Sequence, residues 1–219
     1  MAFEPRVVVV DVETTGTSHA RGDRVCEIGL VVVEGMRIVD RYETLLNPER
    51  EILSRFTEVH GISRATVRKA PKFIDVLPTV LDYLEGALVV AHNATFDHGF
   101  IDNEVYLSSG RGLPIRGICT MRWAWAKWGR SEGTVESVLE RLHIQNRCPH
   151  HALPDAEAET QVLLEFLGPG GVTLENIARA EEEGRIAKYG TGRLPVRGAI
   201  AVPPFARIHD QIGLIPQGR

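Results

Sequence analysis

The sequence predicts an α/β protein in which helices flank a mixed β-sheet. Three observations predict this fold: three extended segments open the chain, a short apolar run lies near residue 90, and helical segments follow it. Strands that precede alternating helices and further strands are typical of a sheet with helices packed on its faces. We therefore expect an α/β sandwich.

The three opening strands are expected over residues 6–13, 26–33 and 37–46. The Glu34-Gly35 turn is short enough to join the second and third strands as an antiparallel hairpin. Asn47-Pro48 ends this part of the chain.

Helical segments follow the hairpin. A helical region is expected up to residue 70, with Ser63 placed to cap a short helix, and Pro71 is expected to start a helix that ends at Glu85. The apolar run 87–91 then predicts a buried strand, parallel to its neighbour and reached by a helical crossover. Further helices are expected over residues 94–108, 120–128, 134–142 and 154–167.

A strong break at Gly168-Pro169-Gly170-Gly171 divides the chain. We place a core domain at residues 1–168 and a C-terminal extension of unknown role at residues 169–219, with a helix over 173–183. The extension is interpreted as a partner-binding arm, a linker or a segment that wraps the core. The sequence does not choose among these three.

Composition limits the classes of protein that fit. A chain of 219 residues, 43% of them hydrophobic, can bury one core and carry an appendage. No stretch approaches the roughly 18 apolar residues of a membrane span, and no signal sequence opens the chain, so we expect a cytoplasmic protein without a membrane partner. Three scattered cysteines are expected to be free thiols.

Charge gives a mixed indication. The net charge of −4 argues against a protein that coats nucleic acid, but it is compatible with an enzyme that has a local basic rim. Residues 111–147 combine seven Lys or Arg with three tryptophans. Such a segment either grips a phosphate backbone and stacks on bases, or forms a helix with core tryptophans and solvated arginines.

Two acids stand at the end of the first strand. Asp11 and Glu13 emerge on the same side because strand side chains alternate, while Val12 points to the other face. Carboxylates held this close repel each other unless a cation or a proton lies between them. The alternative is a solvated strand end.

Two further acids begin helices on the side that should face the sheet. Asp97 aligns with Ile101 and Val105, and Asp155 aligns with Val162. A carboxylate is costly on such a face without a partner, although an acid favoured by the helix dipole is the alternative.

These acids are expected to converge beside the strand ends of one sheet, where open α/β folds place their sites. All-oxygen ligands suit Mg²⁺ or Mn²⁺ and not zinc. Two such ions could hold the attacking and leaving oxygens of a phosphodiester during in-line hydrolysis. A histidine in the loop before Asp155 could reach the same cleft.

Three separated motifs carry a family resemblance. They are residues 11–16 (DVETTG), 92–97 (HNATFD) and 150–155 (HHALPD). In this order they resemble the DEDD exonucleases of the histidine subtype, which include the proofreading epsilon subunit of bacterial DNA polymerase III. The resemblance covers about residues 6–167 and implies a ribonuclease H-like fold with a mixed five-stranded sheet.

The resemblance implies 3′ to 5′ exonuclease activity with two divalent ions, Mg²⁺ or Mn²⁺. Asp11 would bridge both ions, Glu13 and Asp155 would complete one site, and Asp97 would serve the other. His150 would be the general base, since the family spaces its histidine five residues before the last acid. The neighbouring His151 and the unusual Pro154 are the departures at this motif.

The substrate pocket is also implied by the resemblance. Thr14, Thr15 and Asn93 resemble residues that hold the 3′-terminal nucleotide, and Phe96 is expected to be core first and nucleotide-facing second. His60 either belongs to that pocket or is a buried histidine bonded to backbone.

The leading hypothesis is therefore release of nucleoside monophosphates from DNA 3′ ends, in proofreading or repair. The expected partners are single-stranded or frayed 3′ ends and a DNA polymerase subunit. The rivals are the same chemistry on RNA ends and a non-catalytic module that binds nucleic acid or a polymerase. Beyond the resemblance, residues 211–215 (QIGLI) either form an ordinary apolar segment or bind a sliding clamp.

Overall fold

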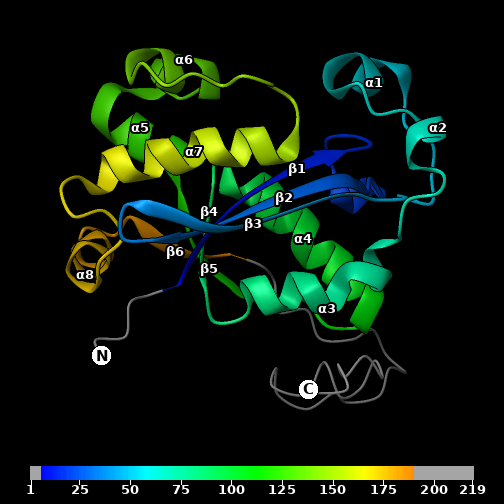
Figure 1. The fold of residues 1–219 in the computed structure, drawn as a ribbon, viewed down its shortest axis with the longest axis horizontal. Helices are drawn as coiled ribbons and strands as arrows, with labels where there is room; N and C mark the ends of the chain where they lie inside the picture. Colours follow the sequence, from blue (N-terminus) through cyan, green and yellow to red (C-terminus); the bar gives the residue numbers. More distant parts are fainter. Residues whose placement is uncertain (1–5, 190–219) are drawn as a thin grey trace.

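The computed structural model describes residues 6–189, and at its centre is a mixed sheet of six strands in the order β3-β2-β1-β4-β5-β6 (Figure 1). The strands are β1 Val7–Thr14, β2 Val25–Glu34, β3 Arg37–Leu45, β4 Leu88–Ala91, β5 Ile115–Cys119 and β6 Ile186–Tyr189. The pairs β1/β2, β2/β3 and β5/β6 are antiparallel, while β1/β4 and β4/β5 are parallel. The predicted α/β fold and its mixed sheet are confirmed.

Helices supply the layers on both sides of the sheet. The α-helices are α1 Ser54–His60, α2 Arg64–Val67, α3 Phe73–Leu84, α4 Ala94–Ser109, α5 Thr120–Trp128, α6 Val135–Arg141, α7 Ala152–Leu167 and α8 Leu174–Glu182. Two short 3₁₀ helices are η1 His19–Arg21 and η2 Arg130–Glu132. As expected, the side chain of Ser63 caps α2 by accepting a hydrogen bond from the Thr66 N–H.

Strand β1 extends past its parallel neighbour. It pairs with β2 along its length, but it pairs with β4 only over Val7–Val9. Strand β4 is short because the chain turns at Asn93, which has a left-handed φ of 58°, and enters α4. The second half of β1 therefore has a free edge at the centre of the sheet.

Alternation along β1 assigns its side chains to two cores. Val8, Val10 and Val12 belong to the core under α3 and α4, whereas Val7 and Val9 belong to the core under α7 and α8. Side chains two apart share a face, so Asp11 and Glu13 continue the Val7 and Val9 row toward α7. The sequence pattern predicted this shared face.

Helix α7 approaches the sheet unusually closely at its N-terminus. Gly29 of β2 lies opposite Asp11, and a Cβ atom there would be 2.4 Å from the backbone of Ala152. Beside it, Glu27 Oε2 accepts a hydrogen bond of 2.9 Å from the Ala152 N–H. The first N–H groups of a helix lack intrahelical partners, so this buried carboxylate both caps α7 and fixes its position.

Several boundaries differ from the expected ones. Strands β5 and β6 were not located by the sequence pattern, and β6 makes the sheet six-stranded instead of five-stranded. Helix α7 begins at Ala152, so Pro154 lies inside its first turn, where its missing N–H has no intrahelical acceptor to lose. Helix α3 begins at Phe73, two residues after Pro71.

The chain after Gly168 remains attached to the core. Val172 forms a bridge with Gly35, Ile177 of α8 packs in the α7 core, and β6 pairs with β5. The candidate clamp-binding segment, residues 211–215, lies outside the described residues. No helix in the described range 6–189 is long and apolar enough to cross a membrane.

The contact at Gly29 gives a first prediction. Gly29→Ala should lower the free energy of unfolding by about 1–3 kcal/mol, because the methyl group overlaps the backbone at the start of α7. Urea denaturation measures this change. A variant as stable as the parent protein would show that α7 can move away freely.

Candidate active site

Five carboxylates meet where β1 passes the end of β4. Asp11 and Glu13 come from β1, Asp97 from the first turn of α4, and Asp155 and Glu159 from one side of α7. Burial raises the pKa of Asp11 well above its ordinary value, and repulsion from each of the other four acids raises it further. The structure thus brings together the four acids that the sequence singled out.

The acids on either side of Asp11 are perturbed in the same direction. Burial, followed by repulsion from Asp155, raises the pKa of Glu13 to about 8. Burial also raises the pKa of Asp97 to about 8, although the N–H groups of Asp97 and Val12 both donate to its carboxylate. Val12 lies beyond the last β1 residue that pairs with β4, so Asp97 satisfies a donor at the free edge.

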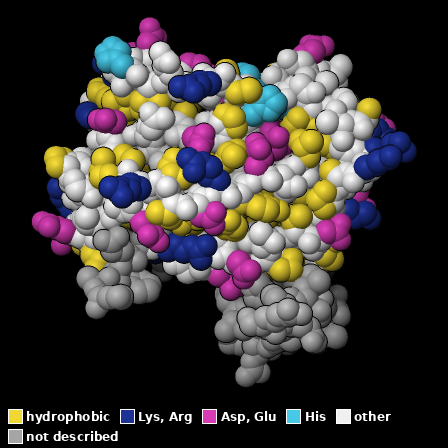
Figure 2. Space-filling view, in the orientation of Figure 1, with side chains coloured by type: hydrophobic (Ala, Val, Ile, Leu, Met, Phe, Trp, Pro, Cys, Tyr) yellow, Lys and Arg dark blue, Asp and Glu magenta, His cyan; other side chains and the backbone are white. Residues whose placement is uncertain are grey.

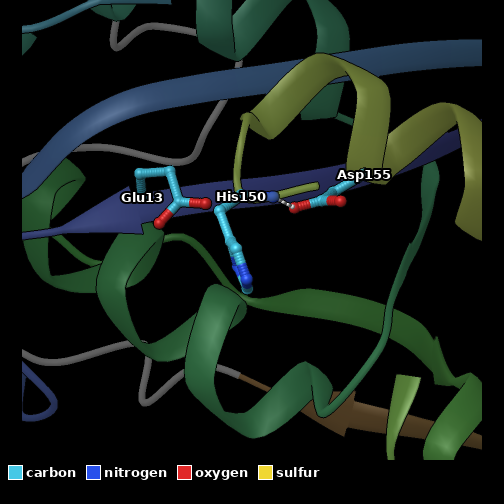
Figure 3. A group of neighbouring side chains, drawn as sticks. All are labelled: Glu13, His150 and Asp155. Atoms are coloured by element: carbon cyan, nitrogen blue, oxygen red, sulfur yellow. Dashed lines mark hydrogen bonds between the residues drawn. The ribbon is translucent and has the colours of Figure 1, made fainter. Parts of the chain in front are cut away.

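Glu13, His150 and Asp155 form the tightest group. One potential ligand atom from each lies within 4.8 Å of the others, and Figure 3 shows the three side chains next to one another. The His150 N–H donates to Asp155 Oδ2 at 3.0 Å, and the Asn146 side-chain amide donates to Asp155 Oδ1. Both carboxylate oxygens of Asp155 are therefore held by the loop that carries His150.

The two adjacent histidines have different surroundings. His150 is exposed and has a left-handed φ of 63°, which places it beside Glu13 and Asp155. His151 is the N-cap residue of α7, and its Nδ1 lies 4.0 Å from Glu27 Oε2. Of the two, His150 has the geometry to exchange a proton with a molecule bound among the acids.

Glu159 is a site residue that the sequence analysis missed. Its side chain is only 3% exposed, and its Oε2 accepts a 2.9 Å hydrogen bond from the His92 N–H at the end of β4. Burial, followed by repulsion from Asp97, raises its pKa well above the ordinary value. The available signal was its spacing of four residues from Asp155, on the same side of α7.

The predicted substrate threonines hold the loop after β1. The Thr14 hydroxyl donates to the Gly16 carbonyl at 2.6 Å, and Thr15 Oγ1 accepts from the Arg24 N–H at 3.1 Å. Both side chains are buried. Their contact with a nucleotide remains a prediction, whereas their role in shaping the rim of the site is visible.

His60 has the bonding expected of a buried histidine. Its Nδ1 accepts from the Ile62 N–H at 3.0 Å, so Nε2 carries the proton that faces the Thr14 carbonyl at 3.3 Å. Burial lowers its pKa. The ring connects the end of α1 to the end of β1, which matches the backbone-bonded alternative.

Asn93 and Phe96 line the other side of the free edge. Asn93 is exposed at the N-cap of α4, where its side chain makes no capping hydrogen bond. Phe96 is half-buried, packs on the α4 core and lies 4.8 Å from the Phe100 ring between centroids. Asn93 is thus the more accessible of the two predicted substrate contacts.

One tryptophan of residues 111–147 is buried, and Trp125 and Trp128 are half-buried. Trp123 is buried under α7, and Trp128 packs on Phe166 with a 5.5 Å centroid distance. The cations nearby stack on these rings; Arg141, for example, lies 5.3 Å from the Trp128 centroid. The structure supports the reading of this segment as a helix with core tryptophans.

The donor set fits hard divalent cations. Carboxylate oxygens predominate, one imidazole stands beside them, and no cysteine belongs to the group of Glu13, His150 and Asp155. Among the described residues, no cation from Lys or Arg pairs with Asp11, Glu13, Asp97, Asp155 or Glu159. The crowded acids therefore have the charge and the ligands for bound metal ions.

Comparison with known proteins gives a consistent result. The family model described as exonuclease (RNase T) matches residues 8–163. The chain is 36% identical over 160 residues to a PolC-type DNA polymerase III of Thermotoga maritima, covering 73% of this chain but 12% of that protein. It is 33% identical over 175 residues to the DNA polymerase III subunit epsilon of Salmonella typhimurium, covering 74% of this chain and 72% of that protein.

The fold agrees with solved structures. One is exonuclease X in complex with 5′ overhanging duplex DNA, which is 26% identical, with a TM-score of 0.63, and covers 79% of this chain and 98% of that one. The chain spans about an eighth of the PolC-type relatives that it matches. These likenesses confirm the fold predicted from the three motifs.

The raised pKa values predict how stability depends on pH. A carboxyl group with a raised folded-state pKa stabilises the fold fully below its unfolded pKa of about 4, and this contribution is lost as the pH rises through the folded value. For Glu13 and Asp97 that value is about 8. In EDTA, the melting temperature should fall from about pH 5 to about pH 9, and Mg²⁺ or Mn²⁺ should reverse the fall.

Scanning fluorimetry across this range tests the prediction. Asp97→Asn removes one of the titrating groups and should give a shallower fall in EDTA. A melting temperature that rises with pH in EDTA would contradict the raised pKa values.

Glu159 gives a second prediction for this site. Glu159→Gln keeps an acceptor for the His92 N–H but removes one negative charge, so the metal-free protein should become more stable at pH 8. Its affinity for Mn²⁺ should fall on the order of tenfold, because a buried charge near the acids is lost. Calorimetry measures the affinity.

A matched control is available two residues away on α7. Glu157→Gln makes the same change on the same helix, but the Glu157 side chain is 38% exposed and pairs with Arg41. It should leave Mn²⁺ affinity unchanged. Equal affinities for all three proteins would show that Glu159 does not act on the site.

Proposed function

Because the chain belongs to the exonuclease family, whose model matches residues 8–163, we propose that it is a metal-dependent 3′ to 5′ exonuclease acting on DNA. The single observation that carries this proposal is the convergence of acids from β1, α4 and α7 beside an exposed histidine. A module that only binds gains nothing from clustered, mutually repelling carboxylates. The arrangement therefore favours catalysis over a scaffold role.

Following the family resemblance, we propose that Asp11, Glu13, Asp97 and Asp155 would hold the metal ions: Asp11 would serve both sites, Glu13 and Asp155 one of them, and Asp97 the other. Bound Mg²⁺ or Mn²⁺ would neutralise the acids and polarise the phosphate that is attacked. Glu159 adds negative charge to this group.

The remaining chemistry belongs to the side chains. His150 accepts the proton of the attacking water as its oxygen bonds to phosphorus, and the bond from phosphorus to the 3′ oxygen breaks. The loop from Asn146 to His150 holds the Asp155 carboxylate close to His150 through two hydrogen bonds. Asn93, exposed at the start of α4, binds the terminal nucleotide together with the rim formed by Thr14, Thr15, His60 and Phe96.

Several features support DNA as the substrate. Relatives named as DNA polymerase III proteins match most of the family domain, and the similar exonuclease X was solved with DNA. We propose a role on single-stranded or frayed 3′ ends, with a DNA polymerase as the partner in proofreading. Residues 1–168 would form the nuclease domain. Strand β6 adds a sixth strand to its sheet, and α8 packs in the core beside α7.

Substitution of the proposed base and the bridging acid tests the mechanism. His150→Ala should lower Mg²⁺-dependent release of nucleoside monophosphates from a DNA 3′ end about 10²- to 10⁴-fold, because the proton acceptor is lost. Asp11→Ala should abolish release. The assay follows 3′-labelled and 5′-labelled oligonucleotides with Mg²⁺, Mn²⁺ or chelator.

His143→Ala is the matched control. His143 also has a left-handed backbone, with φ of 56°, so the substitution carries the same backbone change away from the acids. Unchanged turnover in His150→Ala would refute the assigned base. Faster turnover of a matched RNA oligonucleotide would move the substrate from DNA to RNA.

A further inference from the structure

A basic hollow lies on the surface next to α2. Its volume is about 320 Å³, and its lining includes the cations Arg50, Arg64, Arg68 and Lys72. In Figure 2, dark blue side chains gather at the edge of the molecule where Figure 1 places α2. We propose that this hollow binds backbone phosphates of the nucleic acid outside the group of active-site acids, an inference that rests on the proposed function.

The segment that lines the hollow is positively charged, whereas the whole chain is negatively charged. Residues 49–72 carry six Lys or Arg against three Asp or Glu, while the chain has a net charge of −4. The described structure gives the Arg68 side chain no ion pair. A positive surface of this kind raises the local concentration of a polyanion.

The existing partners of these cations are easily replaced. Arg64 pairs with Glu51, and Lys72 Nζ lies 2.5 Å from Glu49 Oε1. Every side chain in these two pairs is at least 44% exposed. Exposed pairs contribute only about 0–1 kcal/mol, so a phosphate can take the place of the carboxylate.

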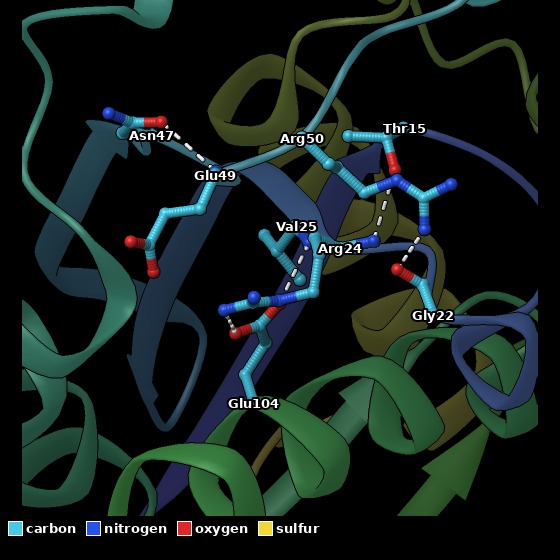
Figure 4. A network of polar contacts seen from close by, with 8 residues as sticks. All are labelled: Thr15, Gly22, Arg24, Val25, Asn47, Glu49, Arg50 and Glu104. Atoms are coloured by element: carbon cyan, nitrogen blue, oxygen red, sulfur yellow. Dashed lines mark hydrogen bonds and ion pairs between the residues drawn. The ribbon is translucent and has the colours of Figure 1, made fainter.

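The hollow is joined to the rim of the active site. Arg50 donates to the Gly22 carbonyl, and its Nη2 lies 3.2 Å from Asp23 Oδ1. Asp23 Oδ2 in turn accepts from the Ser18 N–H, and Thr15 accepts from the Arg24 N–H. Figure 4 shows Arg50 beside Gly22 and Thr15, so the hollow borders the loop that follows the β1 acids.

An anchor on the other side of the same loop keeps it in place. Arg24 donates from Nε and Nη2 to the two carboxylate oxygens of Glu104, at 2.7 and 2.8 Å. Glu104 is buried, so this bidentate pair is shielded from water. The contacts of Arg24 and Arg50 therefore fix the position of the hollow relative to Asp11 and Glu13.

Electrostatics explains why the site needs such a surface. The active site holds five acids, which repel an incoming polyanion until cations neutralise them. Attraction must then come from cations beside the cleft. Nucleic acid phosphates are the ligand that this arrangement fits, whether they belong to the strand being cut or to its complement.

The double variant Arg64→Gln/Arg68→Gln tests the proposal. Its dissociation constant for a 20-nucleotide single strand with a free 3′ end should rise about tenfold at low salt, and the salt slope should fall by about 1.4, which is about 0.7 for each arginine removed. Hydrolysis of thymidine 5′-monophosphate p-nitrophenyl ester, which has no neighbouring phosphates, should change less than twofold. Anisotropy and absorbance measure the two quantities.

Two comparisons complete the design. Arg37→Gln/Arg116→Gln removes two exposed arginines at the opposite end of the sheet and should leave DNA affinity unchanged. Arg68→Lys keeps the charge and should remain close to the parent protein. A larger effect on a 5′-overhang duplex than on the single strand would assign the phosphates to the complement, and an equal effect would assign them to the cut strand.

The two proposals fail in different ways. Unchanged DNA affinity and salt slope in Arg64→Gln/Arg68→Gln would overturn the basic hollow as a phosphate site. Absence of hydrolysis of both ester and oligonucleotide by the parent protein would instead overturn the exonuclease assignment, while the binding comparison would still read out the hollow.

Discussion

Mutual repulsion among buried carboxylates is the constraint on which the rest of this structure depends. Burial, followed by repulsion from neighbouring acids, raises the pKa of Asp11, Glu13, Asp97 and Glu159, yet the fold holds these acids and Asp155 together. It does so with contacts that lie mostly outside the group: the Gly29 approach, the Glu27 cap and the donors to Asp97 and Asp155. The scaffold thus pre-arranges negative charge that a cation can use, instead of assembling it when the cation arrives.

Local patterns in the sequence were sufficient to predict the elements that carry the motifs. The alternation in β1 located Asp11 and Glu13 on one face, and helical spacing turned Asp97 and Asp155 toward the sheet. The hairpin β2/β3 and the parallel direction of strand β4 also followed from local signals. These predictions succeeded because each depends on residues close together in the chain.

What sequence reasoning missed depends on contacts between distant segments. Glu27 bonds to a helix that begins at residue 152, so its role has no local pattern, and the spacing of Glu159 from Asp155 did not reveal its hydrogen bond to the end of β4. Strand β5 contains Arg116 and Gly117, which weaken a strand signal, and it is stabilised by its position between β4 and β6. Likewise, the sequence alone did not show that the cations of residues 49–72 lie beside the loop after β1.

Strand β6 has a consequence for how the molecule can be tethered. Because it runs antiparallel to β5, Ile186 pairs with Ile118 and Tyr189 pairs with Ile115. Ile115 is the first residue of β5. It lies at the end of the sheet opposite the acids, since β5, β4 and β1 run in the same direction. A surface or a fluorophore joined to strand β6 at residue 189 is therefore attached at the end of the sheet opposite the acids, away from the residues that would bind a ligand there.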